Sequence, residues 1–179
     1  MLQRLPKPQA ILQVYAVIVV LLAGWTITAF LWKLSAWLLL LNLGELLTLF
    51  AYAMLTNLLE SLFILLLLLV FTLLLPPRFL RDPFIVRGTI FSIGLIGAMI
   101  AFVGLHMLFG TELGSNVFLG PVAILLLTTT LLSLSLESRL VRGIHSAILR
   151  ITDRLLIFLF ILLPLFVISS IYLIVRNLV

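Results

Sequence analysis

The sequence contains no cysteine and few charged residues. Of its 179 residues, only 9% are Asp, Glu, Lys or Arg, whereas 64% are hydrophobic. The absence of cysteine excludes disulfide bonds, thiolate nucleophiles, cysteine-ligated metals and S-palmitoylation. A soluble domain carries about 25% charged residues, so this chain has too little polar surface to fold in water. Its mean hydropathy of +1.41 therefore predicts a protein whose solvent is the lipid bilayer.

The sequence also lacks the motifs of common catalytic and metal sites. It has no G-x-S-x-G, no H-E-x-x-H and no P-loop, and its two histidines, His106 and His145, fall on opposite sides of the predicted topology. We therefore expect no catalytic residue and no metal site, and the identity of any cofactor stays unknown. The net charge of +5 does not indicate a nucleic-acid partner, because the basic residues lie in short loops beside apolar segments.

Long apolar segments are what the sequence has in abundance. A membrane-spanning helix needs about 20 mostly apolar residues. The predicted spans are residues 11–32, 49–75, 88–109, 119–136 and 155–175. The first segment is too long for the apolar region of a signal peptide, which covers about 7–15 residues. The sequence thus predicts an all-α integral membrane protein, a bundle of five transmembrane helices forming one membrane domain over residues 1–179.

The basic residues predict how this bundle is oriented. With the N-terminus inside, nine of the 11 Lys and Arg residues fall on the inner side, and only Lys33 and Arg176 fall on the outer side. The inner group is Arg4, Lys7, Arg78, Arg81, Arg87, Arg139, Arg142, Arg150 and Arg154. Because positively charged loops stay in the cytoplasm, we expect an N-in, C-out, multi-pass protein of the cell membrane, in the cytoplasmic membrane of a prokaryote.

Two segments are predicted to lie outside the spans. Residues 34–47 are apolar but include Trp37, Asn42 and Glu45, and a sixth span here would move the basic loop after residue 75 to the outer side. This segment is therefore predicted to lie at the outer interface or to re-enter the membrane. Residues 138–154 are predicted to form a cytoplasmic amphipathic helix. Its basic face consists of Arg139, Arg142, Arg150 and Arg154. This helix serves as an orientation anchor or, alternatively, as a partner-docking or lipid-sensing element.

A stripe of polar residues runs along the second predicted span. Its members recur mostly every three or four residues, which places them on one helix face. They are Glu45, Thr48, Tyr52, Thr56, Asn57 and Glu60. A charge at the depth of Glu60 costs about 2.5–3.5 kcal/mol, unless the carboxyl is protonated or faces protein, water or a cation. We expect the stripe to contact a ligand, a lipid or a partner, or else to form hydrogen bonds between helices.

Small residues form a second pattern, on the third predicted span. They are Gly94, Gly97, Ala98, Ala101 and Gly104. Small residues spaced by four allow helix backbones to approach closely. This helix-packing seam is predicted to pack within the bundle or, alternatively, against another molecule.

These features lead to one main functional hypothesis and one alternative. The main hypothesis is a non-enzymatic accessory or scaffold subunit of a larger membrane protein complex, because the loops are too short to form a catalytic domain. The alternative is a small transporter or channel component that uses Glu60 in an outward-facing polar groove. Membrane lipids and other membrane protein subunits are the expected partners.

A second alternative is a lipid-interacting membrane module. Five spans with N-in, C-out topology and a Tyr52, Thr56 and Glu60 ladder resemble the membrane portion of phosphoethanolamine and lipoteichoic-acid transferases. The resemblance implies contact with lipid headgroups. The catalytic domain of those enzymes would follow Val179 here, so the chain itself is not expected to perform their reaction.

Overall fold

The protein is built from long helices. The computed structural model describes residues 6–74, 84–109, 120, 123–129 and 141–178, and no strand occurs among them. The long helices are α1 (Pro8–Trp37), α2 (Leu43–Leu74), α4 (Phe84–Phe109) and α6 (Val141–Leu178). Each contains a stretch long and apolar enough to cross a membrane. The prediction of an all-α protein with helices able to span a membrane is thus confirmed. Most of the predicted span 119–136 lies outside the described residues. Within it, the structure describes only residue 120 and the helical stretch 123–129.

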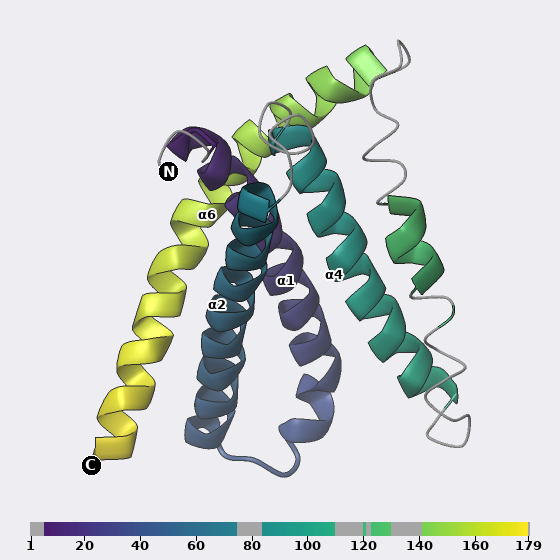
Figure 1. Ribbon diagram of the computed structural model, residues 1–179. Coiled ribbons are helices and arrows are strands. Elements are labelled where there is room, and N and C mark those ends of the chain that lie inside the picture. Colours follow the sequence, from purple (N-terminus) through teal and green to yellow (C-terminus); the bar gives the residue numbers. More distant parts are fainter. Residues whose placement is uncertain (1–5, 75–83, 110–119, 121–122, 130–140, 179) are drawn as a thin grey trace.

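The helices α1, α4 and α6 run in the same direction, and α2 runs against them (Figure 1). Near the starts of α4 and α1, a Cβ added at Gly88 would lie 3.3 Å from Cγ2 of Val14. Gln13 of α1 also donates a hydrogen bond from Nε2 to Oδ1 of Asp153, in the first half of α6. The beginnings of these helices therefore meet at one end of the bundle, called here the N-terminal end, and the α1–α2 turn lies at the opposite end.

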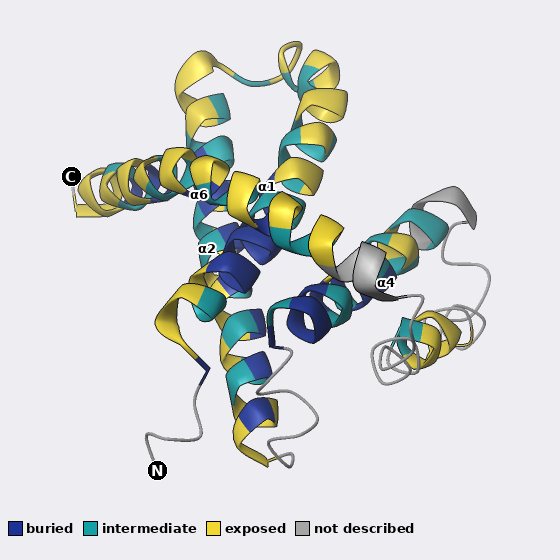
Figure 2. Ribbon diagram, turned by 90° about the horizontal axis from the view of Figure 1, so that it is seen from above, coloured by how far each residue is buried: buried dark blue, intermediate teal, exposed yellow. Residues whose placement is uncertain are grey.

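Helix α1 is at the centre of the bundle, in contact with α2, α4 and α6, whereas α4 and α6 barely touch each other. All residues from 13 to 19 are buried, so this part of α1 is covered on every side (Figure 2). One core cluster joins α1, α2 and α4: Val14, Ile18, Leu22, Ile64, Leu68, Phe84 and Ile96. The other joins α1, α2 and α6: Tyr15, Ala16, Val19, Ala23, Met54, Leu159 and Phe166. A helix that is apolar all round suits this central position.

Residues 34–47 do not form a separate segment between two spans. They are divided between the last turn of α1, a short connection and the first turn of α2. The reason is a capping box, in which the Asn42 backbone N–H donates to Glu45 Oε2 and the Glu45 N–H donates to Asn42 Oδ1, each over 2.9 Å. These reciprocal bonds satisfy N–H groups that have no partner within the helix, so α2 begins at Leu43.

The predicted amphipathic helix 138–154 is likewise not separate from the last span. From Val141 to Leu178 the chain forms one continuous helix, α6, because no glycine or proline interrupts it between Ser146 and Leu163. Residues 138–140 lie outside the described residues. The first part of α6 passes obliquely across the N-terminal end of the bundle before the helix descends along α1 and α2 (Figures 1 and 2).

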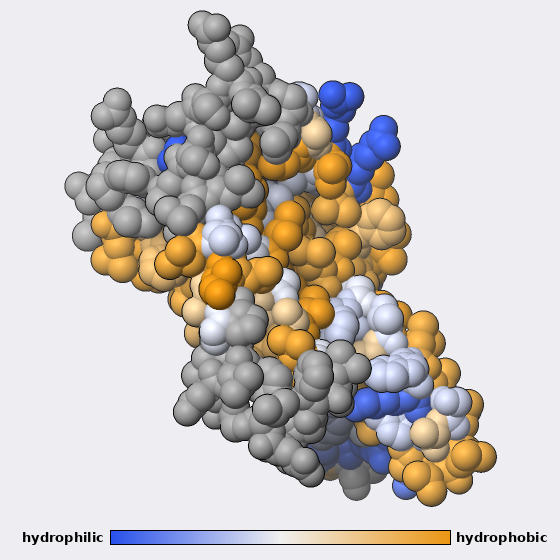
Figure 3. All heavy atoms as spheres, turned by 90° about the vertical axis from the view of Figure 1, so that its right-hand side faces the viewer, coloured by the Kyte–Doolittle hydropathy of each residue, from blue (hydrophilic) through white to orange (hydrophobic). Residues whose placement is uncertain are grey.

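One face of the bundle shows polar and apolar residues in the order that a bilayer favours. On the face seen in Figure 3, strongly hydrophilic residues gather at the two ends, and hydrophobic residues predominate between them. Lipid contact does not penalise exposed leucine and isoleucine side chains on the middle of the helices.

The predicted seam of small residues faces more than one environment. A Cβ added at Gly94 would lie 2.6 Å from Cβ of Thr129, and one added at Gly97 would lie 3.9 Å from Cδ2 of Leu125. These two glycines therefore lie against the helical stretch 123–129. In contrast, a Cβ at Gly104 would meet no atom within 4 Å.

This difference predicts opposite effects of the same substitution on α4. We expect Gly94→Ala to lower the free energy of unfolding by about 1–3 kcal/mol, because Thr129 must move to admit the methyl group. Gly104→Ala is the matched control and should be neutral or slightly stabilising, since alanine favours a helix over glycine by about 1 kcal/mol. Thermal unfolding in detergent measures both. Equal midpoints for the two variants would contradict the packing of Gly94 against Thr129.

Candidate functional site

The polar stripe of α2 is divided between two neighbouring helices. Toward the start of α2, the Thr48 hydroxyl lies 3.2 Å from the Tyr172 hydroxyl, and Asn177 Nδ2 donates to the Tyr52 hydroxyl over 3.4 Å. Both partners belong to α6. Further along α2, Asn57 and Glu60 turn toward α1 and α4. The stripe therefore does not form one continuous groove.

The α6-facing part of the stripe forms hydrogen bonds between helices. Arg176 Nη1 donates to the Gly44 carbonyl over 3.0 Å and to the Tyr172 hydroxyl over 3.3 Å. Together with the contacts of Thr48 and Tyr52, the bond to Gly44 attaches the end of α6 to the start of α2. Glu45 belongs to the capping box, so its carboxylate is engaged at the helix end. The contacts of Glu45, Thr48 and Tyr52 are those of helix–helix attachment and capping.

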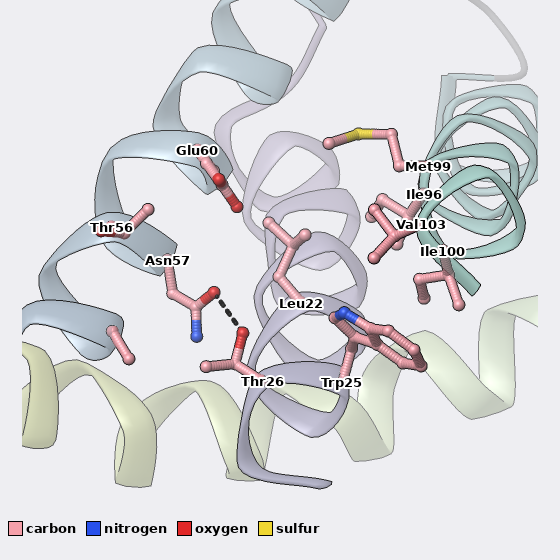
Figure 4. A pocket seen from close by; sticks show the side chains of 11 residues that line it. Leu22, Trp25, Thr26, Thr56, Asn57, Glu60, Ile96, Met99, Ile100 and Val103 are labelled. Atoms are coloured by element: carbon pink, nitrogen blue, oxygen red, sulfur yellow. Dashed lines mark hydrogen bonds between the residues drawn. The ribbon is translucent and has the colours of Figure 1, made fainter. Parts of the chain in front are cut away.

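A cavity of about 320 Å³ lies where α1, α2 and α4 meet (Figure 4). Helix α2 contributes the polar residues Thr56, Asn57 and Glu60 of the stripe. The other lining residues are Leu22, Trp25, Thr26, Ala53, Ile96, Met99, Ile100 and Val103. One wall of the cavity is thus polar and carries a carboxylate, and the α4 wall is wholly apolar.

Asn57 occupies the most enclosed polar position of the cavity. Its side chain is 3% exposed, and the Thr26 hydroxyl donates to its Oδ1 over 2.9 Å. Its Nδ2 is buried and has no hydrogen-bond partner among the described residues. An amide nitrogen without a partner costs about 1–3 kcal/mol when it is buried. This group therefore has an unmet capacity to donate hydrogen bonds.

Glu60 lies next to Asn57 on the polar wall. It is the eighteenth residue of a 32-residue helix, so its carboxylate is near the middle of α2. Figure 4 shows this carboxylate pointing from α2 toward α1. Thr56, in contrast, satisfies its hydroxyl within α2 by donating to the Tyr52 carbonyl over 3.0 Å. Among the described residues, none forms a hydrogen bond or an ion pair with the Glu60 side chain.

The cavity has an opening on the side of the bundle. Trp25, Met99 and Val103 line it and are 36%, 42% and 39% exposed. A carboxylate and an amide N–H in a mostly apolar cavity can bind a polar group whose remaining surface is apolar. Within the described parts of the chain, no set of three or more His, Asp or Glu side chains is placed to hold a metal ion.

The α1 and α4 residues of this site could not be selected from the sequence. Thr26 gives a weak signal, as a hydroxyl within an apolar span, but a single sequence does not indicate that it faces Asn57. Trp25 and Met99 resemble ordinary lipid-facing residues. The basic face predicted on residues 138–154 is separate from the cavity. Arg150 and Arg154 are exposed there, whereas Arg139 and the Arg142 side chain lie outside the described residues.

Comparison with protein-family models, curated proteins and solved structures finds no match. The class of protein is therefore defined by the fold and the site alone. Over the residues that the structure describes, it is an all-helical protein with four helices able to span a membrane and an acidic cavity at the junction of three of them.

Proposed function

We propose that this protein is a non-enzymatic multi-pass membrane protein with five spans, N-in and C-out, that binds a small amphipathic cation at Glu60 as a transporter or channel component. The observation that carries the proposal is the carboxylate of Glu60, which lies near the middle of a membrane-spanning helix, lines a cavity and has no partner among the described residues. An ionisable residue in such a position is costly, and it commonly marks a substrate or ion pathway.

The fifth span is supported by the directions of the described helices. Helix α4 begins at the N-terminal end of the bundle and ends at the opposite end, whereas α6 begins at the N-terminal end (Figure 1). The chain between Phe109 and Val141 must therefore return across the bundle. Backbone that crosses lipid has to satisfy its own hydrogen bonds, and residues 123–129 on this return are helical. The charge distribution then favours a cytoplasmic N-terminus, and a prokaryotic cytoplasmic membrane suits this topology.

The lining of the cavity suggests the chemical class of the ligand. An ammonium group would match the carboxylate, and Trp25 adds an aromatic ring to the lining of the same cavity. The α4 wall, with Ile96, Met99 and Ile100, would cover an alkyl or ring substituent. A volume of about 320 Å³ suits a small organic molecule. The lateral opening would admit such a ligand from the bilayer.

Native mass spectrometry of the protein purified gently from its own membrane tests the proposal. We expect the wild-type chain to carry a small molecule that is absent from Glu60→Gln. A chain whose mass is that of the polypeptide alone, in both forms, would contradict ligand binding. The method also detects subunits that copurify in fixed ratio.

An accessory or scaffold subunit of a membrane complex is the second candidate. It is favoured by α6, because only 22% of the most apolar stretch of this helix is buried. The rest of that stretch is a long surface that lipid or another membrane protein would cover. A fixed set of partner subunits without a small molecule would favour this candidate over transport.

A further inference from the structure

The first part of α6 carries a second cavity, independent of Glu60. Its volume is about 310 Å³, and it is lined by Ala147, Arg150, Ile151 and Arg154. These residues are spaced by three or four, so they share one face of the helix. The two arginines are one turn apart, or about 6 Å along the axis. Two arginine side chains thus line a cavity whose surface is almost wholly apolar.

Neither arginine is neutralised by an acid that the structure describes. Nε of Arg150 donates to the Ser146 carbonyl over 3.3 Å, which leaves its other N–H groups for a ligand. The neighbouring carboxylate, Asp153, accepts a hydrogen bond from Gln13 of α1. Among the described residues, no acid forms an ion pair with Arg150 or Arg154.

The same face of α6 becomes apolar in the direction of the membrane-spanning part. Ile157, Phe158 and Ile161 follow Arg154 on this side of the helix and are 64%, 53% and 63% exposed. A pair of positive charges is therefore continued by an uncovered apolar track about two turns long.

We propose that Arg150 and Arg154 bind the phosphate of an anionic membrane phospholipid, whose acyl chain lies along Ile157, Phe158 and Ile161. Guanidinium groups bind phosphate oxygens in pairs, with geometry that a single ammonium cannot provide. The apolar track favours a lipid over free phosphate, because free phosphate would leave it uncovered. The proposal does not depend on the ligand of Glu60 or on which side of the membrane this end faces.

For the test, the full-length protein is reconstituted in nanodiscs that contain equal amounts of phosphatidylglycerol and phosphatidylcholine. Native mass spectrometry then counts the lipids that stay bound when the protein is released from the nanodisc. We expect the wild type to retain phosphatidylglycerol in preference to phosphatidylcholine. Each of Arg150→Gln and Arg154→Gln should reduce this preference about fivefold, because a basic residue at an anionic surface contributes on that order. Arg176→Gln, which removes the same charge at the other end of α6, should leave it unchanged.

Two further results would overturn the proposal. One is an equal preference in the wild type and in the Arg150→Gln, Arg154→Gln double variant, with both proteins folded as judged by thermal unfolding. The other is loss of the retained lipid on adding millimolar inorganic phosphate, which would mean that the arginines select the anion alone. Persistence of the lipid in phosphate, with its loss in the double variant, is the expected result.

Discussion

Replacing Glu60 with glutamine is expected to weaken the binding of an alkylammonium ion by about ten- to a hundredfold. Hydrogen bonds to a charged group contribute about 1.5–3 kcal/mol, which corresponds to this range of dissociation constants. Glutamine has nearly the same size as glutamate, so the cavity keeps its shape and loses only the negative charge. The variant should unfold at the same temperature as the wild type or at a higher one, because Glu60 has no partner among the described residues to lose.

Hexylammonium and hexanol make a suitable pair of probes for this measurement. They share an apolar body and differ in charge. Glu60→Gln should therefore weaken the binding of hexylammonium and leave the binding of hexanol unchanged. Glu45→Gln is the matched control, since it makes the same substitution on the same helix and glutamine also serves in a capping box. If Glu45→Gln weakened hexylammonium binding as much as Glu60→Gln, the effect would come from overall charge and the assignment of Glu60 would be wrong. Unchanged flux of the ion into proteoliposomes containing Glu60→Gln would exclude the transport role.

The membrane class and the helices were predictable because composition and length decide them. An apolar segment as long as residues 49–75 has no alternative to a spanning helix in lipid, because its backbone N–H and C=O groups must form hydrogen bonds with one another there. The ends of the helices were harder to predict. The prediction of 34–47 as a separate segment rested on the distribution of basic residues and on the polar residues within the segment, and neither locates the end of a helix. The sequence does contain a signal for the start of α2, because Asn42 and Glu45 have the spacing of a capping box. The usual first residue of that motif is serine or threonine, whereas this chain has asparagine.

The candidate site was predicted on one helix only. The spacing of Asn57 and Glu60 placed them on a common face, and the structure brings both to one cavity. The same spacing grouped them with Thr48 and Tyr52, which contact α6 instead. Helical periodicity tells which residues of a helix share a face but not which neighbour each part of that face meets. Thr26 and Trp25 could therefore not be assigned, because their place depends on how α1 packs against α2.

The number of crossings has a decisive test, because the chain contains no cysteine to interfere with labelling. With five crossings, the exposed ends of α1 and α6 at residues 35 and 178 face the same side, and the start of α1 at residue 7 faces the other. We expect Ser35→Cys and Leu178→Cys to react with a membrane-impermeant maleimide in right-side-out vesicles. Lys7→Cys should react only after permeabilisation. The expected contrast is nearly complete, since a spanning helix does not reverse within the membrane.

Four crossings would give a different pattern of labelling. An even number of spans puts both ends of the chain on one side. Lys7→Cys and Leu178→Cys would then either both react before permeabilisation or both react only after it. That result would conflict with the arrangement in Figure 1, where α1 and α6 run in the same direction and the bond between Gln13 and Asp153 joins their first halves. Labelling of Leu178 and Ser35 together, with Lys7 protected, would instead fix the chain from residue 110 to 140 as the fifth crossing, with Glu60 near the middle of the membrane-spanning helix α2.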